Sequence, residues 1–181
     1  MSSANEPFQH AIQSRSGQDI RRCYFCQKCS LGCPTAYAMD LQPAQLLKLV
    51  QLGRKDQVLS AAAIWLCVGC ETCGTRCPNG IALAPVMDVL KQMALAEGYG
   101  AAEPKSLAFH QSFVDSIRYL GRVHEISMLV EYKLRSLDLF ADLGLGLQMF
   151  RRSKLALLPK RVKGLRQVRA MLARIQSREA K

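Results

Sequence analysis

The sequence predicts an all-α fold, with one helical metal-binding domain followed by a helical extension. Three observations lead to this prediction. All 8 cysteines fall in two short runs of identical spacing, which indicates metal ligation. The segments between and after these runs place apolar residues at helical spacing. Aromatic residues make up only 7% of the chain while leucine and alanine are abundant, a composition that favours helices over strands.

The two cysteine runs share the pattern C-x2-C-x2-C-x3-C-P. The first extends over residues 23–34 and the second over residues 67–78. Bacterial ferredoxins that bind two [4Fe–4S] clusters use this pattern, and the fourth cysteine of each run then ligates the other cluster. Applied here, the rule gives two crossed ligand sets. The first cluster takes Cys23, Cys26, Cys29 and Cys77, and the second takes Cys67, Cys70, Cys73 and Cys33.

Zinc sites and disulfides are the alternative uses of these cysteines. Structural zinc usually takes two separated C-x2-C pairs, which a run with three closely spaced cysteines fits poorly. The first 17 residues are polar and lack an apolar signal region. We therefore expect a cytoplasmic location, where thiols stay reduced and metal ligation is favoured over disulfides. We expect no membrane span, because no run of about 18 uncharged apolar residues is present.

The remaining segments are expected to form helices. Between the runs, Gln42-Pro43 predicts the start of a helix and Gly53 its end. A second helix is expected over residues 56–66. Later helices are expected over residues 85–97, 104–120 and 123–139, and from Leu165 to Ile175. Because no segment between the runs alternates as a strand would, we predict an α-helical ferredoxin-like domain rather than a strand-built ferredoxin.

The chain is expected to have four parts. They are a flexible N-terminal arm (1–17), a helical ferredoxin domain with two [4Fe–4S] clusters (18–100), a helical extension (101–149) and a basic amphipathic tail (150–181). The formal net charge is +11, but residues 1–149 hold 14 Lys and Arg against 13 Asp and Glu. Residues 150–181 hold 11 basic residues against one acidic residue. We therefore interpret the tail as a docking segment for a partner protein, with peripheral membrane contact as a second hypothesis.

For the other residues near the cysteines we expect structural roles. We expect core packing for Tyr24, Phe25, Val68 and Trp65. The three histidines are scattered, and no serine–histidine–acid set or glycine-rich phosphate loop is present. The sequence therefore predicts no catalytic residues and no site for a small-molecule substrate.

The cysteine runs and their surroundings resemble the C subunit of heterodisulfide reductase (HdrC). The resemblance rests on the sequence segments C-Y-F-C-Q-K-C-S-L-G-C-P and W-L-C-V-G-C-E-T-C-G-T-R-C-P. It covers about residues 18–97 and is weaker over residues 98–181. More distant likenesses are to the helical two-cluster domains of succinate dehydrogenase, fumarate reductase and glycolate oxidase.

The resemblance implies an electron-relay subunit of a larger complex. In that family, a flavoprotein of the HdrA-like type passes electrons to the HdrC-like protein. The HdrC-like protein passes them to a cysteine-rich catalytic partner of the HdrB-like type, which reduces a disulfide substrate. The resemblance also implies that all eight cysteines are cluster ligands and that catalysis occurs on another chain of the complex.

Two other functions are alternatives. The first is the iron–sulfur subunit of a respiratory or a glycolate- or succinate-type dehydrogenase. Such subunits usually add a [2Fe–2S] domain or a fused cysteine-rich domain, for which this chain has no further cysteines. The second is a basic nucleic-acid-binding protein, which the tail disfavours because Phe150 is its only aromatic residue.

Overall fold

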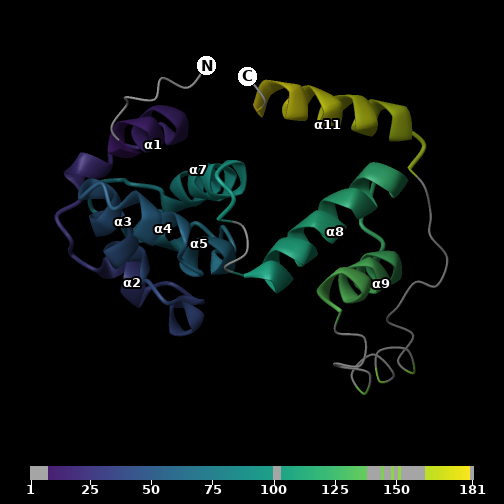
Figure 1. Cartoon of the computed structure of the whole chain (residues 1–181), viewed down its shortest axis with the longest axis horizontal. Helices are drawn as coiled ribbons and strands as arrows, with labels where there is room; N and C mark the ends of the chain where they lie inside the picture. The colour runs from purple at the N-terminus through teal and green to yellow at the C-terminus, as the bar shows by residue number, and fades with distance from the viewer. Residues whose placement is uncertain are drawn as a thin grey trace. The chain divides into compact units, whose positions relative to one another are not determined.

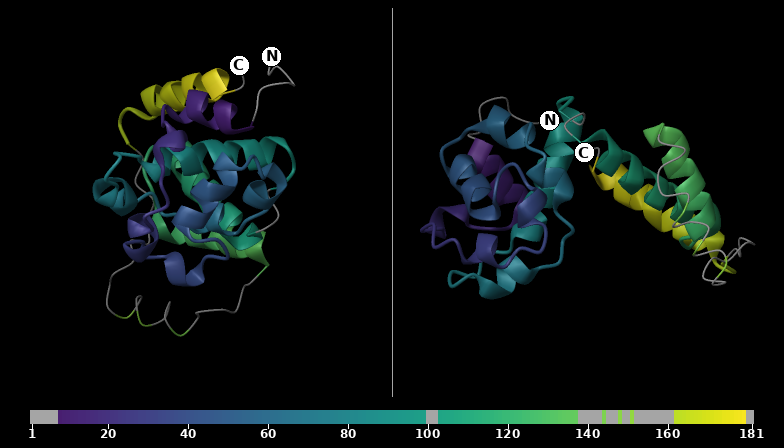
Figure 2. Two further views of the ribbon diagram at one scale, coloured as in Figure 1. Left: turned by 90° about the vertical axis from the view of Figure 1, so that its left-hand side faces the viewer. Right: turned by 90° about the horizontal axis from the view of Figure 1, so that it is seen from below.

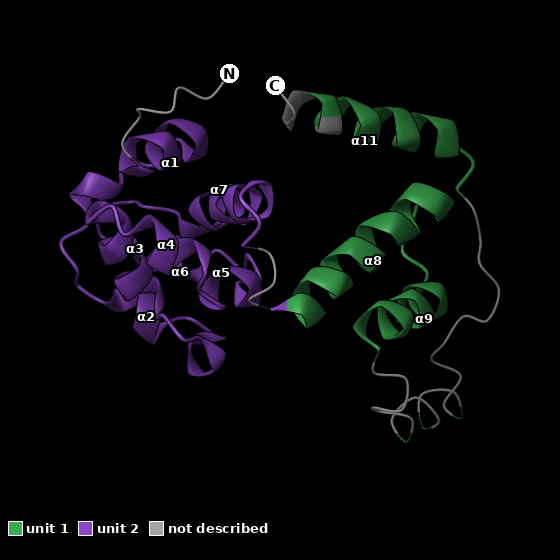
Figure 3. Ribbon diagram, in the orientation of Figure 1, with its two compact units in different colours: residues 1, 104–181 green, residues 2–103 purple. Residues whose placement is uncertain are grey.

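The structure is a computed structural model of the chain. It describes residues 8–99, 103–137, 144, 148, 151 and 162–179. Within these residues all regular secondary structure is helical and no strand occurs, which confirms the predicted all-α fold. The chain divides into two compact units (Figure 3). We call residues 2–103 the N-terminal unit and residues 104–181 the C-terminal unit.

The N-terminal unit consists of short helices and loops gathered around the longer helix α7 (Figures 1 and 2). Its elements are α1 (Phe8–Ser16), η1 (Ile20–Arg22), α2 (Lys28–Leu31), η2 (Ala36–Ala38), α3 (Pro43–Gln51), α4 (Lys55–Leu59), α5 (Ala63–Leu66), α6 (Thr72–Arg76) and α7 (Leu83–Ala96). Helix α7 packs against α1, α4, α5 and α6, while α3 packs against α2 and α4. The apolar sides of α3 and α7 thus supply most of the core between the cysteine loops.

Helix α3 begins and ends where the sequence predicts. Pro43 is its first residue, and the backbone N–H of Gln42 donates to the side-chain oxygen of Gln45 at 2.9 Å. Gly53 follows the helix with φ of +66°, a conformation that costs glycine little. These local signals place a rigid helix directly after the first cysteine run.

Residues 56–66 do not form the single helix that the sequence predicts. The helix breaks after Leu59 and restarts at Ala63, giving α4 and α5. The cause lies far away in the chain, because the carboxylate of Asp40 accepts the backbone N–H groups of Ala62 at 2.9 Å and Ala63 at 2.8 Å. This carboxylate acts as the N-terminal cap of α5, which a local pattern cannot reveal.

The N-terminal segment also differs from the expected flexible arm. Phe8–Ser16 form α1, which packs against α7 through the fully buried Ile12. Arg15 donates to the side-chain oxygen of Gln92 on α7 at 2.8 Å. One buried residue gives no apolar periodicity, so the helix was not expected. Residues 1–7 lie outside the described residues.

The C-terminal unit contains α8 (Pro104–Leu120), α9 (Glu125–Ser136) and α11 (Leu165–Glu179). All three were expected, and α11 extends beyond its predicted end. Helix α9 packs on α8, where the rings of Phe109 and Tyr132 meet edge to face at 5.9 Å between centroids. Helix α11 also packs on α8. The expected tail is described only at residue 151 and over residues 162–179.

Among the described helices, none is both long and apolar enough to cross a membrane.

Candidate iron–sulfur site

The two cysteine runs fold into nearly the same backbone shape. The third and fifth residues of each run have positive φ. These are Phe25 (64°) and Gln27 (62°) in the first run, and Gly69 (63°) and Glu71 (59°) in the second. A left-handed residue before a right-handed turn directs successive backbone N–H groups into one concave surface, a geometry found at many iron–sulfur sites. Three of the four positions are not glycine, so the loops accept local strain to form this shape.

Each run then continues into a helical turn that carries its third cysteine. Helix α2 holds Cys29 and α6 holds Cys73, and the two helices pack against each other. At their ends, the N–H groups of Cys33 and Cys77 bond the carbonyl three residues earlier, both at 3.2 Å. The fourth cysteine therefore leaves each turn in the same way. The two runs form an internal structural repeat.

A cavity brings together the four cysteines predicted for the second cluster. It is lined by Cys33, Cys67, Cys70 and Cys73. Apolar side chains form most of the remaining wall, among them Met39, Leu83 and Met87, and Thr35 and Glu71 are its polar residues. Cys33, the last cysteine of the first run, thus faces the three leading cysteines of the second run. These cysteines are far apart in the sequence, but the crossed-ligand rule of two-cluster ferredoxins predicts that they lie together.

Cysteines of the other predicted ligand set lie near Tyr24. Partial loss of solvent, and then the nearby thiols of Cys26, Cys77 and Cys23, raise the pKa of the Tyr24 hydroxyl. Cys77, from the second run, therefore lies close to the leading cysteines of the first run. Cys29 lies near Cys23 as well, and burial raises the pKa of its thiol.

Polar groups beside the sulfur atoms of the second run oppose the effect of burial on the thiol pKa values. The backbone of Gly69 does so at Cys67, and that of Leu83, the first residue of α7, does so at Cys73. The side chain and backbone of Thr72 lower the pKa of Cys70, with Thr72 Oγ1 at 3.4 Å from Cys70 Sγ. Donors of this kind stabilise a thiolate over a thiol.

Opposing this, burial raises the pKa of Cys67 and Cys73. Buried thiols of this kind become thiolates most readily when a metal compensates the charge. These surroundings are compatible with cysteines that ligate a metal.

The donor set fits an iron–sulfur cluster better than zinc. A zinc ion would draw four thiolates to about 2.3 Å from one point. Structural zinc usually takes two separated C-x2-C pairs, whereas each run here has three cysteines within seven residues. The four cysteines instead surround a cavity with apolar walls and backbone donors. An anionic cluster with one thiolate on each iron suits such a cavity.

The interpretation of the neighbouring aromatic and aliphatic residues as core is correct only for Trp65. Its side chain is 3% exposed, and its buried Nε1 has no hydrogen-bond partner in the described part of the chain. Tyr24 is 63% exposed, Val68 is 66% exposed and Phe25 is 38% exposed. All three lie on the cysteine loops, and the expectation of core packing is wrong for them.

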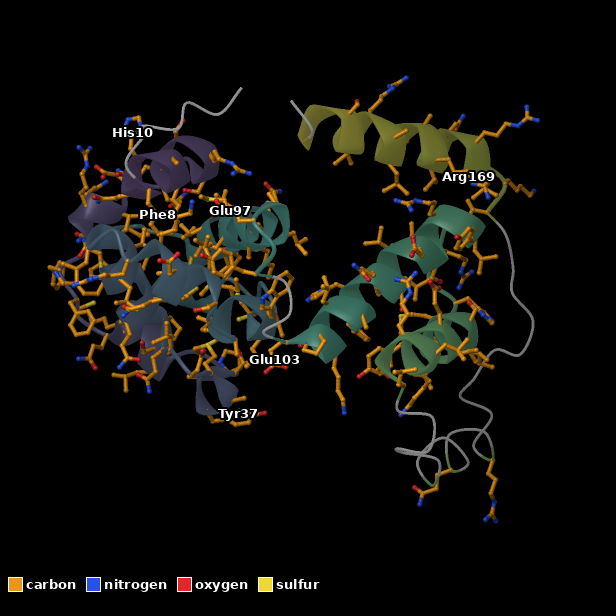
Figure 4. The ribbon with its side chains drawn as sticks, in the orientation of Figure 1. Phe8, His10, Tyr37, Glu97, Glu103 and Arg169 are labelled. Atoms are coloured by element: carbon orange, nitrogen blue, oxygen red, sulfur yellow. The ribbon has the colours of Figure 1, made fainter. Side chains whose placement is uncertain are left out.

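Two side chains near the cysteines were not anticipated. The side-chain nitrogen of Gln51 donates to the carbonyl oxygen of Cys23 at 3.0 Å. The ammonium of Lys91 donates to the carbonyl oxygen of Cys67 at 3.2 Å. Each residue directly follows the buried stripe of the helix after a cysteine run, and aligning α3 with α7 would have revealed the pair. Figure 4 shows how densely side chains fill this unit, with Tyr37 projecting at its edge.

Comparison with known proteins supports the assignment of these loops. Residues 19–81 match the 4Fe-4S dicluster domain family. The chain is 25% identical over 103 residues to the C subunit of the H(2):CoB-CoM heterodisulfide,ferredoxin reductase of Methanothermobacter thermautotrophicus, covering 57% of this chain and 56% of the relative.

Two relatives from Methanosarcina have higher identity. One is the C subunit of the Ferredoxin:CoB-CoM heterodisulfide reductase of Methanosarcina acetivorans, 34% identical over 51% of this chain and 37% of the relative. The other is the protein of the same description from Methanosarcina mazei, 30% identical over 54% of this chain and 60% of the relative. The chain spans about half the length of the curated relatives it matches.

Proposed function

We propose that this chain is an HdrC-like protein and serves as the electron-relay subunit of a multi-subunit oxidoreductase. It is similar to HdrC where the 4Fe-4S dicluster domain matches, over residues 19–81. The proposed role is to pass electrons between an HdrA-like flavoprotein and a cysteine-rich, HdrB-like catalytic partner.

The observation that carries this proposal is the cavity that Cys33 shares with three cysteines of the other run. A second set of thiols, including Cys77, lies around Tyr24. We assign two [4Fe–4S] clusters to these places, with the crossed ligand sets of the ferredoxin rule. When bound, such clusters accept and release single electrons.

The protein around the clusters is arranged for relay. Packing of α2 against α6 joins the two cysteine loops directly, so the two ligand sets share one rigid support. Cys26 and Cys70 are exposed, one from each run. Each ligand set therefore has a side that a partner protein can approach, as electron entry and exit require.

The C-terminal unit supplies the proposed attachment to partners. Helix α11 is held on α8 by Arg169, whose Nε donates to the carbonyl oxygen of Arg118 at 2.9 Å (Figure 4). Met171 and Ile175 of α11 remain exposed, and the surrounding side chains are basic. An amphipathic basic helix of this kind suits a protein groove with acidic edges.

The relay is tested by electron transfer between purified partners. The HdrA-like and HdrB-like proteins of the same organism are mixed anaerobically, with and without this chain, and reduction of the HdrB-like protein is followed after the flavoprotein is reduced. We expect transfer to require the chain with its clusters. Equal transfer without the chain, or with a chain that lacks clusters, contradicts the proposal.

A further inference from the structure

The internal repeat extends beyond the cysteine runs into the helices that follow them. Helix α3 follows the first run and α7 follows the second, and their buried faces have the same register. In α3 the buried stripe is Leu46, Leu47 and Val50, and in α7 it is Val86, Met87 and Leu90. The next residue of each helix is polar: Gln51 in α3 and Lys91 in α7. The two helices are therefore equivalent supports that differ in charge at two equivalent positions, Lys48 against Asp88 and Gln51 against Lys91.

Both polar residues reach back to the first cysteine of the preceding run. Gln51 Nε2 donates to the carbonyl oxygen of Cys23 at 3.0 Å and to that of Ile20 at 2.9 Å. Lys91 Nζ donates to the carbonyl oxygen of Cys67 at 3.2 Å. The same hydrogen bond is thus made by a neutral amide beside one ligand set and by an ammonium beside the other.

The charge of Lys91 is only partly screened. Its side chain is 19% exposed, so water has limited access to it. Asp88 approaches its Nζ at 3.9 Å, but the Asp88 side chain is 70% exposed and the pair is long. An exposed pair at this distance offsets little of the field that the ammonium exerts on the neighbouring thiol.

We infer that Lys91 makes the cluster of Cys67, Cys70, Cys73 and Cys33 easier to reduce than it would be with the glutamine found at the equivalent position of the repeat. Each electron adds negative charge to a centre that four thiolates already make anionic, and a fixed ammonium nearby stabilises the reduced form. Net charge and hydrogen bonds to the sulfurs are established determinants of cluster potential. The inference rests on the proposed assignment of two clusters. Lys91 adds one charge difference between the two sites, which also differ at Glu71 of the second run, where the first run has Gln27.

The test exchanges the two side chains. The variants Lys91→Gln and Gln51→Lys are prepared with their clusters, and each midpoint potential is measured by a redox titration followed by EPR. Lys91→Gln keeps a hydrogen-bond donor and removes the charge, so we expect it to lower the potential of the cluster on the Cys67 run alone. Gln51→Lys should raise the potential of the cluster on the Cys23 run. Signals are assigned with Cys26→Ser and Cys70→Ser, each of which perturbs its own cluster.

Lys91→Arg is the matched control, because it keeps the charge and should leave both potentials near those of the unaltered chain. Thermal unfolding of each variant shows whether the exchange has disturbed the fold. If Lys91→Gln shifts neither potential, or shifts both by the same amount, the inference is wrong while the two-cluster assignment stands. If the unaltered chain assembles no [4Fe–4S] cluster, the proposed function fails and this inference fails with it.

Discussion

The two units of this chain are stabilised by different kinds of interaction. The N-terminal unit has a dense apolar core from several helices. Its fully buried side chains include Ile12, Ile20, Leu46, Leu47, Leu59, Ile64, Leu83, Met87 and Leu90. Among the described residues of the C-terminal unit, only Ala108, Ser112, Ser116 and His124 are buried. Helix α9 has no buried residue at all.

Polar contacts hold much of the C-terminal unit together. Arg135 bonds Asp115 across α8 and α9 at 2.8 Å, and Arg169 joins α11 to α8. Large apolar side chains remain exposed on all three helices: Val114, Tyr119, Leu129, Val130, Leu134, Met171 and Ile175. The contrast indicates that the N-terminal unit completes its own core, whereas the C-terminal unit has apolar surface available for a partner.

Removal of the clusters gives the sharpest contrast between the units. Chelation of iron should collapse the two cysteine loops, because the thiolates have no other ligand and the loop backbone is strained. We expect new protease cleavage within residues 23–38 and 67–81, and no new cleavage within residues 104–137. Visible absorbance measures the loss of the clusters, and mass spectrometry of the fragments locates the cleavage sites. Cleavage spread equally over the two units contradicts the comparison.

Deletion of residues 150–181 separates docking from cluster binding. The shortened chain should keep both clusters, because every cysteine lies in the N-terminal unit. It should no longer co-purify with its partner proteins, since the basic helix α11 is removed. Iron content and affinity co-purification are the measurements. Unchanged co-purification refutes the docking role of the tail.

Replacing a leucine by alanine should lower the free energy of unfolding more in the N-terminal unit than in the C-terminal unit. Leu46→Ala in α3 removes a fully buried side chain and should lower the free energy of unfolding by about 2–5 kcal/mol. Leu134→Ala in α9 is the matched control, because that side chain is 60% exposed and should change stability by less than about 0.5 kcal/mol. Anaerobic chemical denaturation of both variants measures the difference. Equal losses would show that α9 is covered in the isolated chain.

The smallest expected effect concerns the attachment of α11. Arg169→Ala removes the hydrogen bonds to the carbonyl oxygens of Arg118 and Tyr119 and should weaken this attachment by on the order of 1 kcal/mol. Faster amide exchange over residues 165–177 reports the effect, with both clusters unchanged. Arg166→Ala on the same helix is the control. If both variants behave alike, Arg169 has no special part in holding α11.

The sequence predicted those parts of the molecule that local signals determine. The repeated cysteine spacing predicted that Cys33 lies with Cys67, Cys70 and Cys73, and Gln42-Pro43 with Gly53 bounded α3 correctly. The misses come from contacts between distant residues. Asp40 interrupts the helix expected over residues 56–66, and α1 packs on α7 through the buried Ile12 and the hydrogen bond from Arg15 to Gln92.

The environment of the cysteines was harder to predict than the cysteines themselves. Tyr24 and Val68 look like core residues in a sequence, but they lie on the cysteine loops and are 63% and 66% exposed. Gln51 and Lys91 carry no local pattern of their own. Their role becomes visible only when the two repeats are compared with each other in space.

The proposed relay depends above all on the crossed exchange of the fourth cysteines, for which EPR of single cysteine variants is the decisive experiment. Cys77→Ser should perturb the same cluster signal as Cys26→Ser, despite its position in the other run. Cys33→Ser should likewise perturb the same signal as Cys70→Ser. If Cys77→Ser instead perturbs the signal of Cys70→Ser, each run holds its own cluster and the crossed assignment is wrong.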